Sequence, residues 1–329
     1  MRFFKKRSKI GLVLGSGAAR GLAHIGAIKA LEEERVPIDM IAGTSIGALV
    51  GACYAKGGTI TEFEEVVLKT DWKRLFQLAD FDLAFKFKGF VHGEKVKELL
   101  KTIIGDIQFK DLKIPLAVMA TDVNTGEEVL MKEGSVIEAV RASISIPVIF
   151  MPVKIRDRFL IDGGIVNPLP VNVVKKMGAT SVIACNVIQA PSKRKKSKKQ
   201  ESVETKNQEF IRGSSVFDKS TVLMALNNQI NTIIRENKDK MESLRKVVDD
   251  FKEKIPVVSQ GVDANTPNIF DVLTQALYAM EYEIVRSKVR KADIMIEPDI
   301  GNIATFEFYR GEEAILKGYE AGRRALSKG

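Results

Sequence analysis

The pentapeptide G-T-S-I-G at residues 43–47 constrains the local fold more than any other feature of this chain. It lies between an apolar run, residues 38–42, and a helix-like run, residues 46–55. A G-x-S-x-G sequence in that context is typical of a strand, a sharp turn and a helix, with the serine hydroxyl exposed above the sheet. The same pattern also occurs by chance, so by itself it leaves Ser45 as open to a structural role as to a reactive one.

Histidine, the usual base beside such a serine, is scarce in this chain. The sequence has two, His24 and His92, and no histidine follows His92 to complete the order Ser, Asp or Glu, His. His24 is expected on the helix after the first strand, and His92 in a turn before a later helix. A buried, hydrogen-bonded imidazole and a turn residue are the favoured interpretations, because a base must reach the hydroxyl proton. The base for Ser45 is therefore expected to be a carboxylate.

Asp162 is the best carboxylate candidate. It ends a short expected strand, residues 158–161, and is followed by Gly163 and Gly164. Glycines let backbone approach closely, so this carboxylate could stand at a strand end and face another loop. Turn chemistry alone also explains Asp-Gly-Gly, and these residues leave both interpretations open.

A loop of small residues follows the first expected strand, residues 10–14. The loop and the start of the next helix are made of Gly15, Ser16, Gly17, Ala18, Ala19, Arg20 and Gly21. Backbone N–H groups at a helix start form an anion site, for a phosphate or for the oxyanion of acyl transfer. The dinucleotide pattern G-x-G-x-x-G fails at Arg20, and the Gly-Lys-Ser/Thr of a P-loop is missing. We interpret the segment as an oxyanion loop, with a nucleotide-binding α/β protein as the rival.

Together these three segments resemble the patatin-like phospholipases, and specifically their bacterial branch. That family has a glycine-rich oxyanion loop ending in Arg-Gly, a later G-x-S-x-G serine, and an Asp-Gly-Gly/Ala aspartate. It works with a Ser–Asp dyad and no catalytic histidine. The matching residues here are 15–21, Ser45 and Asp162, within a resemblance that covers roughly residues 8–190 and 268–325.

One segment departs from the family pattern. Where the commonest family loop has three consecutive glycines, this chain has Ser16, Gly17 and Ala18. The amides survive this change, so the departure affects only how bulky a head group fits above the loop.

The resemblance implies a serine hydrolase of lipid esters, with phospholipids and lysophospholipids as the first substrate class and no cofactor or metal. Asp162 would accept the Ser45 proton, and amides of residues 15–18 and of Ile46 would hold the oxyanion. Arg20, beside Gly21, would orient the loop or attract a phosphate; a surface cation on a first helical turn is the other interpretation. The alternative function is a non-hydrolytic lipid- or acyl-binding regulator with the same fold.

Composition agrees with an intracellular globular enzyme. With 329 residues, 45% of them apolar, the chain can bury a large core. No apolar run reaches the roughly 18 residues of a spanning helix, and the basic start lacks a cleavable apolar region. Cys53 and Cys185 lie in apolar elements, which indicates core residues rather than a disulfide or a metal pair. These features predict a cytoplasmic protein.

Positive charge is concentrated in two tracts. Residues 1–9 hold five basic groups, residues 193–199 hold six, and without these eleven the net charge of +9 would be −2. Such tracts attract anionic lipid surfaces, and nucleic acid equally; solvated tails are the other interpretation. Because a lipid hydrolase finds its substrate at a membrane, we expect peripheral binding at the inner membrane and no nucleic-acid partner.

The remaining pattern is an alternation of strands and helices. Strands are expected at 10–14, 38–42, 114–121, 126–131, 152–156, 158–161, 181–187 and 293–297. Helices are expected at 22–34, 46–56, 60–69, 93–104, 135–142, 171–177, 270–290 and 311–326. The alternation predicts an α/β domain with a largely parallel sheet, and the resemblance specifies a patatin-like three-layer sandwich with a helical insertion.

Four segments follow from this pattern. Residues 1–9 form a basic tail, residues 10–190 the catalytic core, and residues 266–329 a helix-strand-helix that completes the core. Residues 191–265 form a basic linker and an amphipathic helical insertion, with apolar residues three and four apart. That insertion could pack on the core, cap the site, face a membrane or form a homodimer contact.

Overall fold

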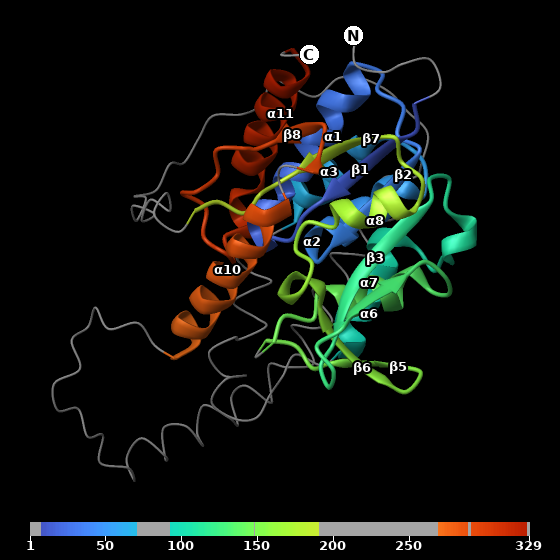
Figure 1. Ribbon diagram of the computed structural model, residues 1–329, viewed down its shortest axis with the longest axis vertical. Coiled ribbons are helices and arrows are strands. Elements are labelled where there is room, and N and C mark those ends of the chain that lie inside the picture. The colour runs from blue at the N-terminus through green and yellow to red at the C-terminus, as the bar shows by residue number, and fades with distance from the viewer. Residues whose placement is uncertain (1–7, 71–92, 148, 191–268, 289–290, 328–329) are drawn as a thin grey trace, which may run out of the picture.

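The computed structural model describes residues 8–70, 93–147, 149–190, 269–288 and 291–327. In this part of the chain a central sheet lies between two layers of helices (Figure 1). The predicted three-layer α/β sandwich with a mostly parallel sheet is confirmed. His92, the tract at residues 193–199, the insertion at 191–265 and most of the N-terminal tail lie outside the described residues.

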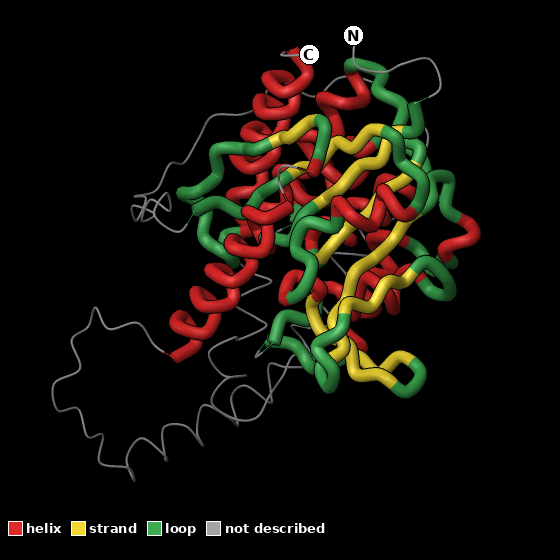
Figure 2. The backbone as a smooth tube through the Cα atoms, in the orientation of Figure 1, coloured by secondary structure: helices red, strands yellow, loops and turns green. Residues whose placement is uncertain are grey.

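Eight strands form the described sheet, shown in yellow in Figure 2. They are β1 (Ile10–Leu14), β2 (Met40–Thr44), β3 (Leu116–Asp122), β4 (Glu128–Met131), β5 (Val153–Ile155), β6 (Arg158–Asp162), β7 (Ser181–Cys185) and β8 (Ile294–Ile296). Their order is β5-β6-β3-β2-β1-β7-β8, with β4 also paired to β3. The strands from β3 to β8 in this order are parallel, whereas β4 and β6 run antiparallel to β3.

Helices connect and cover these strands. The α-helices are α1 (Ala23–Glu33), α2 (Ile46–Ala55), α3 (Ile60–Lys69), α6 (Gly93–Ile104), α7 (Val136–Ser143), α8 (Val171–Lys176), α10 (Ile269–Lys288) and α11 (Gly311–Ser327). Short 3-10 helices include η1 (Ala18–Leu22) and η3 (Gly163–Ile165). Each predicted strand and helix has a counterpart whose ends differ by at most two residues. Near the site, the element whose observed ends differ most from its predicted ends is β2. It continues to Thr44, directly before Ser45, rather than ending at residue 42.

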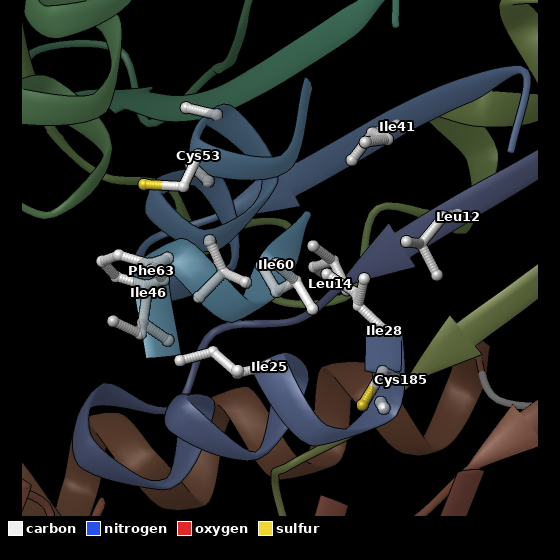
Figure 3. Close-up of a cluster of buried hydrophobic side chains, with 14 of the residues drawn as sticks. Leu12, Leu14, Ile25, Ile28, Ile41, Ile46, Cys53, Ile60, Phe63 and Cys185 are labelled. Atoms are coloured by element: carbon white, nitrogen blue, oxygen red, sulfur yellow. The ribbon is translucent and has the colours of Figure 1, made fainter. Parts of the chain in front are cut away.

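Both faces of the central parallel strands β1, β2 and β3 are buried, as parallel sheets require. Alternate residues of a strand point to opposite faces, so Leu12 and Leu14 of β1 pack with α1, α2 and α3 (Figure 3), while Val13 packs with α8 and α10. Cys53 and Cys185 belong to the first of these clusters and form no disulfide. Their predicted role as small core residues is confirmed.

The C-terminal segment belongs to the same layers. β8 extends the sheet beside β7, and α11 packs along α1. The two helices meet backbone to backbone: a Cβ on Gly26 would lie 1.9 Å from the Ile315 carbonyl oxygen, and one on Gly318 would lie 1.9 Å from that of Ala23. Glycine at these two positions lets the helix axes approach this closely.

Candidate active site

Ser45 stands on a sharp turn between β2 and α2. Its φ of 55° lies in the left-handed region, which is strained for a residue other than glycine. The flanking glycines are required by space, since a Cβ on Gly43 would lie 2.5 Å from the Gly47 carbonyl oxygen. A Cβ on Gly47 would lie 2.2 Å from the Leu14 carbonyl oxygen. The pentapeptide therefore forms the strand–turn–helix that its sequence predicts, and the strain is located at the serine.

The Ser45 hydroxyl donates a hydrogen bond to Asp162. The distance from Oγ to Oδ2 is 2.6 Å, although the two residues are 117 positions apart. Both side chains are 4% exposed, so this contact is nearly free of solvent. The geometry is that of a hydroxyl positioned to give its proton to a carboxylate.

The register of three strands explains how these residues meet. Thr44 of β2 pairs with Met119 of β3, and the next residue of β3, Ala120, pairs with Asp162 of β6. The residue after Thr44 therefore comes to lie beside the end of β6. The backbone N–H of Ser45 also donates to Ser143 Oγ at 2.8 Å, and that hydroxyl donates to the Met119 carbonyl oxygen at 2.5 Å.

Asp162 combines a turn contact with its contact to the serine. Its Oδ1 accepts a hydrogen bond from the Gly164 N–H at 2.7 Å, while Oδ2 faces Ser45. Burial raises the pKa of Asp162 from 3.8 to about 7, and the hydrogen bonds from Ser45 and Gly164 oppose that rise. Turn chemistry and a reactive carboxylate, which the sequence leaves as alternatives, are thus compatible in one side chain.

The loop after β1 packs against this turn, but its amides are not equivalent. The Gly15 N–H donates to the Cys185 carbonyl oxygen at 3.2 Å and the Ser16 N–H to that of Pro168 at 2.9 Å. These two amides already have acceptors, which weakens their predicted part in an oxyanion site. Gly17 and Ala18, by contrast, donate no backbone hydrogen bond to a described residue. Ala18 has a φ of 48°, so the loop also holds a residue other than glycine in the left-handed region.

Ile46 offers a further amide on the other side of the serine. It is the first residue of α2, and the first amides of a helix have no acceptor within the helix. Gly21 packs directly on it, since a Cβ on Gly21 would lie 2.0 Å from Ile46 Cγ2. The glycine of the loop's Arg-Gly end therefore lets η1 approach the start of α2.

His24 lies beneath the loop and is fully buried. Its Nε2 is 2.8 Å from the Gly15 carbonyl oxygen, and because that oxygen can only accept, Nε2 carries the hydrogen. Nδ1 is buried without a hydrogen-bond partner among the described residues. Burial lowers the pKa of His24 from 6.5 to about 4, so the ring is neutral at physiological pH. This is the buried, hydrogen-bonded imidazole that the sequence favours.

Arg20 is also fully buried, and the interpretation of this residue as a surface cation is wrong. Its Nε donates to the Ile303 carbonyl oxygen at 2.8 Å and Nη2 to Thr305 Oγ1 at 3.4 Å. The guanidinium carbon lies 4.4 Å from the centre of the Tyr278 ring. The C-terminal segment supplies this enclosure, which no local pattern around residue 20 could reveal.

A carboxyl group that sequence reasoning missed also borders the site. Glu281 of α10 extends to Gly164, directly beside Asp162 and Ser16. Its only sequence signal is a place in an amphipathic helix, which does not distinguish it from a surface residue. Elsewhere among the described residues, no three His, Cys, Asp or Glu side chains are grouped as metal ligands would be.

Comparison with known proteins agrees with this arrangement. The profile of the patatin-like phospholipase family matches residues 12–175, which include the end of β1, the loop, Ser45 and Asp162. The chain belongs to this family. The match ends before α10, so Glu281 and the segment that encloses Arg20 lie beyond it.

Relatives extend the similarity to nearly the whole chain. An uncharacterized NTE family protein of Mycobacterium bovis is 28% identical over 97% of this chain and 91% of its own length. Neuropathy target esterase sws of Drosophila melanogaster is 35% identical over 55% of this chain and 13% of its own length. Human patatin-like phospholipase domain-containing protein 6 is 35% identical over 54% of this chain and 13% of its own length.

Proposed function

We propose that this member of the patatin-like phospholipase family is a serine-dependent lipid acyl hydrolase with a Ser45–Asp162 dyad. The observation that carries the proposal is the buried 2.6 Å hydrogen bond from Ser45 Oγ to Asp162 Oδ2. Asp162 accepts the hydroxyl proton while Oγ attacks an ester carbonyl carbon. The proton then passes to the leaving alcohol, and water resolves the acyl-serine with Asp162 again as base.

The pKa of Asp162 suits this role. An ordinary aspartate is a weak base near neutral pH, whereas burial raises the pKa of Asp162 to about 7. General-base catalysis is most effective when the pKa of the base lies near the working pH. His24 is neutral, but it bonds to the loop rather than to Ser45, so the mechanism uses no imidazole.

The oxyanion is stabilised by amides of Gly17 and Ala18 in the loop and of Ile46 at the start of α2. The amides of Gly15 and Ser16 are not among these donors, because they already bond to the carbonyl oxygens of Cys185 and Pro168. One such donor is typically worth about 3 kcal/mol of transition-state stabilisation. Arg20, held by Ile303 and Thr305, orients the loop rather than binding substrate.

The substrate is a lipid ester, with phospholipids and lysophospholipids as the first class. The family of the chain supports this choice, and so does the pair of basic tracts that could hold the protein at an anionic surface. No helix in the described part of the chain is both long and apolar enough to cross a bilayer.

Turnover and covalent labelling test the proposal together. Wild type is expected to hydrolyse members of a panel of phospholipids, lysophospholipids and p-nitrophenyl esters, and to form an adduct with an organophosphonate at Ser45. Ser45→Ala should lose both the turnover and the adduct. Ser287→Ala, which removes a hydroxyl from the exposed side of α10, is the matched control and should retain them.

Two results would contradict the proposal. An organophosphonate adduct that persists in Ser45→Ala would place the nucleophile elsewhere. Lipid binding without turnover or labelling in wild type would instead favour a non-hydrolytic lipid-binding protein with this fold.

A further inference from the structure

A second carboxyl group, that of Glu281, lies beside the dyad. Its Oε1 is 2.1 Å from the position that a Cβ on Gly164 would occupy. Asp162 Oδ1 and Ser16 Oγ are each 3.1 Å from that same position. The Glu281 side chain keeps some exposed surface, but its carboxyl end is enclosed by these atoms. Side chains from three segments therefore converge on a residue that has no side chain of its own.

Contacts one turn earlier in α10 (orange in Figure 1) hold Glu281 in this direction. Tyr278 is buried, its ring faces the guanidinium of Arg20 at 4.4 Å, and its hydroxyl accepts a hydrogen bond from the Gln189 N–H at 2.9 Å. Residues three apart lie on the same side of a helix, so the side of α10 that carries Tyr278 also turns Glu281 toward the dyad.

Three groups act on the charge of Glu281. Burial and the negative charge of Asp162 at the end of β6 raise the pKa of Glu281, while Ser16 in the loop and Arg20 in η1 lower it by less. The net result is a pKa of about 8, above that of Asp162 at about 7. Two carboxylates this close and this enclosed are costly to ionise together, so the pair holds one proton near neutral pH and titrates as a unit.

We propose that Glu281 is a positioning residue for the dyad: it keeps the proton that the two carboxyl groups share, so that Asp162 is the one able to accept the proton of Ser45. This inference rests on the proposed function. During attack the Ser45 proton moves to Asp162 and then to the leaving alcohol, while Glu281 retains its own. An ionised Glu281 would add negative charge beside the loop where the oxyanion forms, so its ionisation lowers turnover.

The pH dependence of kcat/KM on a soluble p-nitrophenyl ester tests this directly, with the rate of Ser45→Ala subtracted. Wild type should give a bell-shaped profile, whose alkaline side falls by about tenfold per pH unit once Glu281 ionises. Glu281→Gln should lose that alkaline fall and keep the acidic side, because glutamine has the same shape and cannot ionise. Glu283→Gln, an exposed neighbour paired with Arg286, is the matched control and should keep the wild-type profile.

A second measurement does not depend on turnover. At about pH 7.5 the difference infrared spectrum between wild type and Glu281→Gln should show the carbonyl stretch of one protonated carboxylic acid in wild type. Gly164→Ala should remove the same band, because its methyl group would occupy the place of Glu281 Oε1 and expel the carboxyl to solvent. The clash at 2.1 Å is with the end of a flexible side chain, and Asp162 Oδ1 and Ser16 Oγ at 3.1 Å need to shift only slightly, so the variant is expected to fold.

The inference is overturned if Glu281→Gln retains the alkaline fall of wild type, or if the difference spectrum contains no acid band. If wild type hydrolyses none of the esters, the proposed function fails. The infrared band alone then decides whether Glu281 holds the proton.

Discussion

Asp162 illustrates how burial converts a common side chain into a usable base. Burial brings its pKa to about 7. Below that pH the carboxyl group is protonated and can no longer act as the base, so activity decreases. kcat/KM should therefore fall as the pH drops through about 7, with a single ionisation on the acidic side. The fall reflects loss of the carboxylate that accepts the Ser45 proton.

A histidine substitution separates this mechanism from an imidazole-based one. His24→Gln should keep the midpoint of the acidic limb, because the ring bonds to Gly15 and is already neutral. Its cost should appear as about 1–3 kcal/mol of stability if the Gly15 carbonyl loses its partner. A pH–rate profile checks this, and loss of the acidic limb in this variant would show that His24 is the base.

The burial of Asp162 also has a cost in stability. Because its pKa in the fold lies above the ordinary 3.8, the folded state binds more protons than the unfolded state between that value and about 7. The contribution of this group to stability therefore decreases as pH rises through that window and stays at its lowest above it. Asp162→Asn, which removes the charge, should raise the free energy of unfolding by roughly 2 kcal/mol at about pH 8.

Urea unfolding of both proteins at about pH 4 and pH 8 measures this effect. The gain should be smaller at the lower pH, where the wild-type carboxyl is protonated. A variant that is less stable than wild type at both values would contradict the account, although its loss of turnover is expected in either case.

Among the elements, the pair α1 and α11 depends most on close backbone contact. Gly318→Ala would bring a methyl group to 1.9 Å from the Ala23 carbonyl oxygen, so one helix must shift. Overpacking against backbone should lower the free energy of unfolding by about 3 kcal/mol. Leu316→Ala on the exposed side of α11 is the control and should change it by less than about 0.5 kcal/mol.

The free energy of unfolding of the two variants, measured with denaturant, shows whether α11 packs closely against α1. Equal stability of Gly318→Ala and wild type would mean that the helices do not touch as described. The outcome also bears on the site, because the segment between β8 and α11 holds Arg20 through Ile303 and Thr305.

For the whole molecule, the uneven charge predicts binding to membranes. Deleting residues 193–199, which lie outside the described part, should weaken binding to anionic vesicles by removing six basic groups worth about 1 kcal/mol each near a lipid surface. Wild-type binding should decrease with added salt because screening shortens the reach of these charges. Vesicle co-sedimentation measures both effects.

Turnover of a soluble p-nitrophenyl ester is the control for that deletion and should not change. Unaltered binding to anionic vesicles after the deletion would show that the tract has no membrane role. Equal binding to neutral vesicles would point instead to apolar insertion.

Local sequence patterns were sufficient to predict the helices and strands and the turn at Ser45. Periodicity places apolar residues on one face of helices such as α3 and α11 and on both faces of the central strands β1, β2 and β3, and glycines at 43 and 47 permit a turn that larger residues would block. The periodicity is a property of residues a few positions apart, whereas the space that Gly47 leaves is taken by the Leu14 carbonyl oxygen of β1. The pairing of the serine with a carboxylate, rather than a histidine, also followed from residue counts and from the family resemblance.

The tertiary structure decided how the distant groups meet. The register of β2, β3 and β6 brings Asp162 to Ser45, and contacts to Cys185 and Pro168 occupy two loop amides that the sequence left equivalent. The enclosure of Arg20 and the approach of Glu281 come from the C-terminal part of the chain. Such contacts depend on strand register and helix packing across more than a hundred residues, which no local pattern encodes.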